Sequence, residues 1–187
     1  MQYAVFFRNL NLGRPLAPTK AQFEQAFLDA GAITAQSFLT NGTLVFTTKP
    51  RANPKTLLTN AAKRLHAVCG LVEPGFMRPM DSLCELVAQQ PFAAVDPASV
   101  YACCVSFLDP RVADLPRLPF GSLRADVEVL RITATEALCI SRKIGNTPGS
   151  PNAFLEKHFA LPATTRVWNT VVRLVQKHAG PGQLGRY

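Results

Sequence analysis

The sequence predicts a mixed α+β fold made of two successive ferredoxin-like subdomains of the βαββαβ type, with a linking helix and a C-terminal helix. Short apolar runs rich in β-branched and aromatic residues alternate with stretches of helical periodicity. The 187 residues, 48% of them hydrophobic and 17% charged, suffice for one sizeable domain or two small ones. The elements follow the order β-α-β-β-α-β, then a linking helix, then roughly β-α-β-β-α-α. We expect an N-terminal subdomain over 1–79, a linking helix and loop over 80–97, a C-terminal subdomain over 98–179 and a flexible tail over 180–187.

The first half opens with "YAVFF" (3–7), whose apolar run is typical of a central strand. Thr19 and Gln22 have the spacing of a capping box, which predicts a helix ending at Gly31. Its apolar face would consist of Phe23, Ala26, Phe27 and Ala30.

"ITAQSFL" and "TLVFTT" flank Asn41-Gly42, which predicts a β-hairpin. Asn53 before Pro54 predicts the start of a second helix, which Gly70 would close. A weaker strand near 75–78 would complete the first subdomain.

The second half starts with a short helix over 82–89 and a strong strand over 100–108. The proline-interrupted "DPRVADLPRLPFG" leaves room for one or two helical turns before two strands, "VEVLRI" and "ALCIS". Ser150 before Pro151 predicts a helix over 151–160.

A last helix is expected at about 164–179, and it holds the only tryptophan, Trp168. We expect Trp168 to be a structural anchor, and its truncation to alanine would cost about 3–5 kcal/mol if the ring is fully buried. On a helical wheel the apolar side contains Val167, Val171, Leu174, Val175 and His178, widened by Trp168 and Val172. The opposite, polar side contains Arg166, Asn169, Thr170, Arg173 and Lys177.

Four segments of the chain are "FFRNLNLGR", "FLTNGTLVF", "RPMDSLCELVAQQPF" and "TTRVWNTV". They resemble, in the same order, the motifs R-G-x-N-V-G, Y-I-Q-S-G-N-V-V-F, R-x-x-x-E-L…P-F and T-T-R-N-W-N-T-V of the bacterial family known as domain of unknown function 1697. The resemblance runs from Met1 to about His178. It implies two successive ferredoxin-like subdomains and no established activity.

The chain departs from the family pattern at Asn9, at Asn41-Gly42-Thr43, at Pro79 and at Val167. Part of any ligand site that the family shares would therefore be altered here. The positions that match are Arg8, Asn11, Gly13, Gly42, Arg78, Arg166, Trp168, Asn169 and Thr170.

Composition and motifs exclude several classes of protein and of site. No apolar run approaches the roughly 20 residues of a membrane span, and the N-terminus lacks a basic leader, so we expect a cytoplasmic location. The five cysteines have no C-x-x-C spacing and are expected to be buried free thiols. The histidines, His66, His158 and His178, are far apart, so no metal site is expected. No motif indicates a cofactor or a catalytic residue, and whether the protein is an enzyme stays open.

Charge is uneven along the chain, whose net charge is +8. Residues 1–78 and 140–187 are basic, whereas residues 79–139 are acidic. If the basic ends meet, they would attract an anionic partner, and the alternative is that the charge serves solubility.

Three segments carry hydrogen-bond donors that could hold an anion, and each has a structural alternative. The loop 8–14 could bind a polar ligand, or it could need its residues for turn geometry and an ion pair at Arg8. The stretch 141–152 could present a helix N-terminus to phosphate, or Ser150 could be a simple cap. On the last helix, Arg166 and Asn169 could border a pocket floored by Trp168, or face water. The candidate ligand-binding residues are Arg8, Asn11, Gly13, Arg142, Ser150, Arg166 and Asn169.

The leading hypothesis is a small protein that binds a phosphate- or carboxylate-bearing small molecule between its subdomains. The first alternative is a nucleic-acid-binding module, since aromatic residues on ferredoxin-like sheets can stack bases. Tyr3, Phe6, Phe7 and Phe46 lie on the relevant strands, but the expected aromatic and basic strand motif is missing, and the three phenylalanines are better explained as core residues. The second alternative is an adaptor for a partner protein. The oligomeric state is not predicted.

Overall fold

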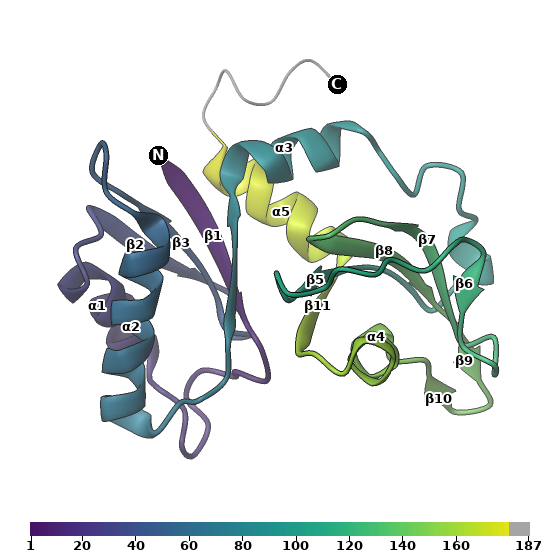
Figure 1. The fold of residues 1–187 in the computed structure, drawn as a ribbon, viewed down its shortest axis with the longest axis horizontal. Coiled ribbons are helices and arrows are strands. Elements are labelled where there is room, and N and C mark those ends of the chain that lie inside the picture. Colours follow the sequence, from purple (N-terminus) through teal and green to yellow (C-terminus); the bar gives the residue numbers. More distant parts are fainter. Residues whose placement is uncertain (180–187) are drawn as a thin grey trace. The chain divides into compact units, whose positions relative to one another are not determined.

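The computed structural model describes residues 1–179 and divides the chain into two compact units. Unit 1 is Met1–Leu83, and unit 2 begins at Cys84. Five α-helices and several antiparallel sheets in the described residues confirm the mixed α+β class (Figure 1). No helix within 1–179 is both long enough and apolar enough to cross a membrane. The tail expected to be flexible, 180–187, lies outside the described residues.

Unit 1 has a four-stranded antiparallel sheet in the order β2-β3-β1-β4, with two helices on one of its faces (Figure 1). The predicted order of elements over 1–79 is the observed one. Its elements are β1 (Gln2–Phe7), α1 (Lys20–Asp29), β2 (Thr34–Phe38), β3 (Thr43–Thr47), α2 (Pro54–Cys69) and β4 (Gly75–Pro79).

Local signals in the sequence place the helices of unit 1. The Thr19 hydroxyl accepts from the backbone N–H of Gln22, and the Gln22 side chain accepts from the N–H of Thr19, so the capping box is present. Asn53 caps α2 by accepting from the N–H of Lys55 at 2.9 Å, and α2 ends at Gly70, which has a φ of 70°. Each helix starts where a side chain satisfies backbone donors that have no partner within the helix.

The core of unit 1 lies between its sheet and its helices. Phe7 of β1 is fully buried, and its ring meets those of Phe23 and Phe27 edge to face, with centroids 5.5 and 6.4 Å away. Phe6 and Phe46 are fully buried too. The expectation that these phenylalanines belong to the core is confirmed.

Unit 2 contains a five-stranded antiparallel sheet in the order β11-β5-β8-β7-β6. The helix α3 (Met80–Ala88) crosses the division between the units, and a short 3-10 helix, η1 (Pro97–Ser99), follows it. The strands are β5 (Ala102–Leu108), β6 (Phe120–Gly121), β7 (Val127–Ile132), β8 (Glu136–Ser141), β9 (Lys143–Ile144), β10 (Thr147–Pro148) and β11 (Ala163–Val167), and the helices are α4 (Pro151–Phe159) and α5 (Trp168–His178).

The helices α4 and α5 lie on opposite faces of this sheet (Figure 1). Successive residues of a strand point to opposite faces. Accordingly Cys104 packs in the cluster that contains Leu155 of α4, while Cys103 lines a pocket together with Trp168 of α5. Unit 2 is therefore a three-layer arrangement of helix, sheet and helix.

Two predictions for the second half are wrong. The stretch between β5 and β7 contains no helix and forms only the short strand β6, because Pro110, Pro116 and Pro119 each lack the N–H that a helix needs. The last helix does not begin at Thr164, because residues 163–167 pair with β5 as strand β11. This segment contains three β-branched residues, which favour a strand.

All five cysteines are free thiols, and three of them, Cys84, Cys104 and Cys139, are buried. Cys69 and Cys103 are partly exposed, so the expectation of buried thiols holds for most of the set. Burial raises the pKa of Cys104 to about 11 and that of Cys139 to about 12. Both thiols therefore stay protonated at neutral pH.

At most two thiols should react quickly with dithionitrobenzoate at pH 8, and all five should react after denaturation in guanidinium. The thiolate is the nucleophile, and burial both withholds it and blocks access in the folded protein. The absorbance of the released thionitrobenzoate gives the number of thiols that have reacted. Rapid reaction of three or more thiols in the native protein would contradict the burial described above.

Candidate functional site

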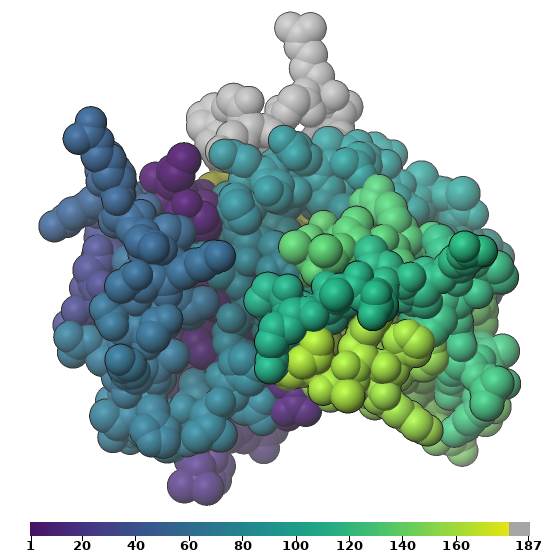
Figure 2. All heavy atoms as spheres, in the orientation of Figure 1, coloured from purple at the N-terminus to yellow at the C-terminus, as the bar shows by residue number. Residues whose placement is uncertain are grey.

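A groove in unit 2 runs along one face of α4. Ser150, Ala153, Phe154, Lys157 and His158 line it at spacings of three and four residues, which place them on one side of a helix. The atoms of α4 reach the molecular surface, where they are drawn in yellow-green in Figure 2. The groove has a volume of about 880 Å³, within the range of roughly 300–1,000 Å³ that is usual for small-molecule sites.

The opposite wall of the groove is the turn between β6 and β7, residues 121–127, together with Thr147 and Pro148 of β10. Ser122 orders this turn: its hydroxyl donates to the Asp126 carboxylate at 2.6 Å and accepts from the N–H groups of Asp126 and Val127. The wall is thus held by its own hydrogen bonds.

Gly149 joins the two walls. A Cβ atom at Gly149 would collide with the carbonyl oxygen of Asp126, so only glycine allows the backbones to approach this closely. The N–H of Gly149 donates to the carbonyl of Arg142 at 2.9 Å, and the Ser141 hydroxyl donates to the carbonyl of Gly149 at 2.6 Å. The start of α4 is therefore fixed against the β6–β7 turn.

The groove is lined by one cationic side chain from each wall. Arg124 comes from the β6–β7 turn and Lys157 comes from α4, where the neighbouring His158 adds an imidazole ring. All three are exposed to solvent. One carboxylate, Asp126, also lines the groove, but its side chain is only 13% exposed and lies 3.6 Å from Arg124 Nε. Positive charge predominates on the accessible lining.

Ser150 acts as the N-cap of α4, as predicted. Its hydroxyl accepts from the N–H of Ala153 at 3.2 Å. The first turn of a helix presents N–H groups and a partial positive charge, which adds to the positive potential of the groove.

The other sequence-predicted donors make contacts within their own units. Arg8 Nη1 lies 2.7 Å from the Glu73 carboxylate, and Asn9 Nδ2 donates to the same group, which ties the loop after β1 to the segment before β4. Arg142 Nη2 lies 2.7 Å from Glu128. The ion pair of Arg8 is the structural alternative that the sequence left open, whereas that of Arg142 differs from the solvated cation expected there. Asn11 and Gly13 belong to the same loop as Arg8, and Gly13 has a φ of 74° that favours glycine.

Arg166 and Asn169 do not share a helical face. Arg166 lies in β11, where it is buried and donates to the Thr164 hydroxyl at 2.8 Å and to the Thr165 carbonyl at 2.9 Å. Burial lowers the pKa of the Arg166 guanidinium to about 10. Asn169 is exposed in the first turn of α5. A helix that begins at Thr164 would put both on its polar side, but the β-branched residues of this segment form β11 instead.

Of the seven predicted ligand-binding residues, Ser150 alone lines the α4 groove. Arg124, Lys157 and His158 also line it and are not among the predicted residues. A signal for two of them existed: Lys157 and His158 stand seven and eight residues after Ser150, on the same helical face. No sequence pattern links Arg124 to α4. Within residues 1–179, no group of three or more His, Cys, Asp or Glu side chains is placed to hold a metal ion.

The sequence model of the family described as "Protein of unknown function (DUF1697)" matches residues 1–137. The chain belongs to this family. The match includes the β6–β7 wall of the groove and ends before α4. The similarity of "TTRVWNTV" to the family motif lies beyond the matched residues and stays a prediction.

A solved structure is similar in fold to this DUF1697 protein. The conserved bacterial protein SP0830 from Streptococcus pneumoniae shares 14% sequence identity with a TM-score of 0.62, and the alignment covers 94% of this chain and 97% of that one. At this identity the similarity concerns the fold alone. No curated protein sequence matches the chain.

Trp168 is partly buried rather than fully buried, and it lines a pocket. Its ring packs on Phe92, with centroids 5.3 Å apart and planes at 62°. Trp168→Ala should therefore lower the free energy of unfolding by about 2–3 kcal/mol, less than the value for a fully buried ring. Urea denaturation followed by circular dichroism measures the change. A loss of about 5 kcal/mol would show that the ring is a core residue after all.

Proposed function

We propose that unit 2 binds an anionic small molecule, bearing a phosphate or a carboxylate, in the α4 groove. The observation that carries the proposal is the convergence of Arg124 from one wall with Lys157 and His158 from the other. An anion between them would gain charge-assisted hydrogen bonds from two separate segments of the chain. The N-terminus of α4 at Ser150 adds a favourable potential.

The apolar part of the lining indicates an organic anion rather than a bare inorganic ion. Leu123, Phe154 and Pro148 line the groove beside the cationic groups. Sites for small molecules combine apolar walls with a few polar groups that fix orientation. A ligand with a charged group and an apolar or planar body would use both parts of the lining.

This proposal is narrower than the hypothesis drawn from the sequence. It relies on side chains of unit 2 only, and Arg8, Asn11, Arg142 and Arg166 are not required by it. The order and antiparallel pairing of the strands in unit 1 support our further assignment of unit 1 as a ferredoxin-like subdomain. The cytoplasmic location stays a prediction.

A nucleic-acid-binding function has less support. Base stacking on a ferredoxin-like sheet needs exposed aromatic rings on its central strands. Phe6, Phe7 and Phe46 are fully buried, and Tyr3 stacks on Phe46 with centroids 5.6 Å apart. Phe7 and Phe46 belong to the core cluster between the sheet and its helices and cannot receive bases without unfolding of that core.

Phenyl phosphate should raise the melting temperature of the protein, and Lys157→Ala should weaken its binding by about fivefold or more. Loss of one exposed charge-assisted contact costs about 1 kcal/mol, which is about a fivefold change in affinity. Isothermal titration calorimetry at constant ionic strength measures the dissociation constants. Uncharged benzyl alcohol is the ligand control and should bind far more weakly.

The matched control variant is Arg173→Ala. It removes one exposed cationic side chain from unit 2 at a position that does not line the groove. Arg173→Ala should bind phenyl phosphate like the wild type. Equal weakening by both variants would mean that net charge, and not the groove, holds the anion. Failure of phenyl phosphate to bind the wild type would also contradict the proposal.

A further inference from the structure

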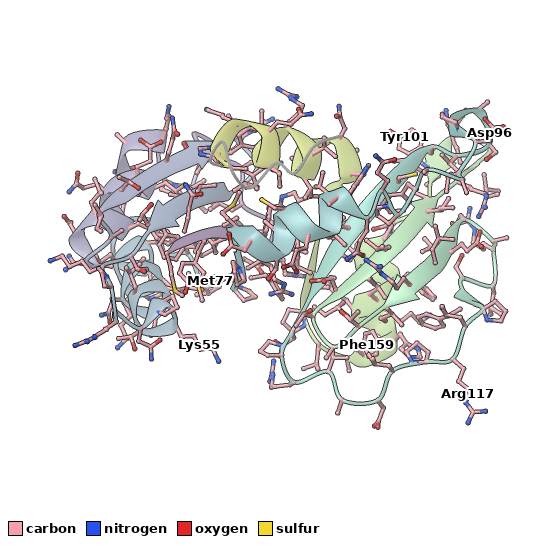
Figure 3. All side chains as sticks on the ribbon, turned by 90° about the horizontal axis from the view of Figure 1, so that it is seen from above. Lys55, Met77, Asp96, Tyr101, Arg117 and Phe159 are labelled. Atoms are coloured by element: carbon pink, nitrogen blue, oxygen red, sulfur yellow. The ribbon has the colours of Figure 1, made fainter. Side chains whose placement is uncertain are left out.

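A second pocket of unit 2 lies on the opposite side of its sheet from α4. It is bordered by the end of α3 and the segment after it, by the start of β5 and by one face of α5, and its volume is about 600 Å³. Tyr101 directly precedes β5 and lies at the same end of unit 2 as Asp96 (Figure 3). No residue lines both this pocket and the α4 groove.

Aromatic rings form a large part of its wall. Trp168 and Phe92 meet nearly edge to face, and Tyr101 is 60% exposed. A partly exposed indole and an exposed phenol present flat apolar surfaces at which another ring can stack or meet an edge. Val172 of α5 lies one turn after Trp168 and extends the apolar surface of the pocket.

The polar groups of this pocket are neutral. Among the described residues that line it, none carries a charge, although the chain contains 20 Lys and Arg and 12 Asp and Glu. Gln90 and Gln176 each contribute a carboxamide, which both donates and accepts hydrogen bonds. A charged ligand would lose hydration in this pocket without gaining a counter-charge.

We propose that this pocket, which we call the Trp168 pocket, is a binding site for a neutral, planar heteroaromatic molecule that both donates and accepts hydrogen bonds. The rings of Trp168 and Tyr101 contact the faces or edges of such a molecule. The carboxamides of Gln90 and Gln176 pair with its polar edge. The volume is sufficient for a ligand of two fused rings.

The single tryptophan provides a specific reporter, because an amide-proton NMR spectrum of the ¹⁵N-labelled full chain contains one indole N–H signal. Titration with quinolin-2-one, a neutral planar lactam, should shift this signal with a dissociation constant of about 1 mM or below. Octahydroquinolin-2-one, the saturated lactam with the same polar edge, should bind about threefold to tenfold more weakly. Quinoline-2-carboxylate should not shift the signal.

Val172→Lys places a charge in the wall of the pocket and should weaken quinolin-2-one binding about tenfold or more. Asn169→Lys adds the same charge to α5 at an exposed position outside the lining, and it should bind like the wild type. Binding of phenyl phosphate should be unchanged in Val172→Lys. The proposals for the Trp168 pocket and for the α4 groove can therefore fail independently of each other.

Three results would overturn the proposal. An indole signal that does not move with quinolin-2-one up to about 5 mM would show that the pocket binds no such molecule. Equal affinity for the planar and the saturated lactam would remove the requirement for an aromatic ligand. Binding of quinoline-2-carboxylate as tightly as quinolin-2-one would remove the requirement for neutrality.

Discussion

Phe7→Ala should lower the free energy of unfolding by about 3–5 kcal/mol. Phe7 is fully buried in β1, and its ring contacts those of Phe23 and Phe27 on α1. Truncation removes the apolar contact and leaves a cavity between the sheet and this helix. Because a domain of this size has a total stability of about 5–15 kcal/mol, the loss would be a large share of it. Urea denaturation followed by circular dichroism measures it.

Tyr101→Ala is the control for this variant. Tyr101 is also aromatic, but it is 60% exposed and lies in unit 2. Its truncation should change the free energy of unfolding by less than about 1 kcal/mol. A Phe7→Ala protein as stable as Tyr101→Ala would contradict the packing of β1 against α1.

Gly149→Ala should lower the free energy of unfolding by about 3 kcal/mol. The new Cβ would collide with the carbonyl group of Asp126, which is backbone and cannot rotate away as a side chain could. The strands and turns around it are tied together, since the N–H of Arg142 donates to that same carbonyl at 2.8 Å. Thermal denaturation should show a lower melting temperature, and phenyl phosphate binding should weaken because the two walls of the groove separate.

Gly145→Ala is the control that distinguishes a steric collision, as expected at Gly149, from the strain of a left-handed backbone conformation. Gly145 has a φ of 60°, but nothing lies within 4 Å of a Cβ atom placed there. Its replacement should cost only about 1 kcal/mol, the conformational penalty of a left-handed residue. Equal destabilisation by both replacements would show that the close approach at Gly149 is not the reason for its glycine.

Much of unit 1 could be predicted from the sequence, because its signals are local. The capping box at Thr19 and the cap at Asn53 fix helix starts within a few residues. The spacing of Phe23 and Phe27 identifies the buried face of α1 without knowledge of the sheet. Turn chemistry around Gly42 likewise marks the hairpin, where a φ of 68° favours glycine.

The wrong start of the last helix has a tertiary cause. Val167 fits the apolar side of a helix that begins at Thr164, but residues 163–167 pair with β5 as a strand. Because β11 and β5 are separated by more than fifty residues, no local pattern reveals this partnership. A helix that begins at Thr164 would expose Arg166, whereas Arg166 is buried in the sheet.

The candidate groove was only partly predictable for a related reason. Ser150 was found because an N-cap is a local signal, and the position of Lys157 and His158 follows from helical spacing once α4 is known. Arg124 joins them only through the approach of the β6–β7 turn to Gly149. Anion binding by residues 141–152 stays a prediction, and the fold uses Arg8, Arg142 and Arg166 in internal contacts.

An NMR titration of the ¹⁵N-labelled full chain with phenyl phosphate, at constant ionic strength, tests the anion-binding proposal most directly. The proposal predicts saturable shifts concentrated in residues 121–127 and 150–158, and much smaller shifts in Lys157→Ala at the same phosphate concentration. Shifts concentrated in the loop 8–14, or no saturable shift in either segment of unit 2, would contradict it.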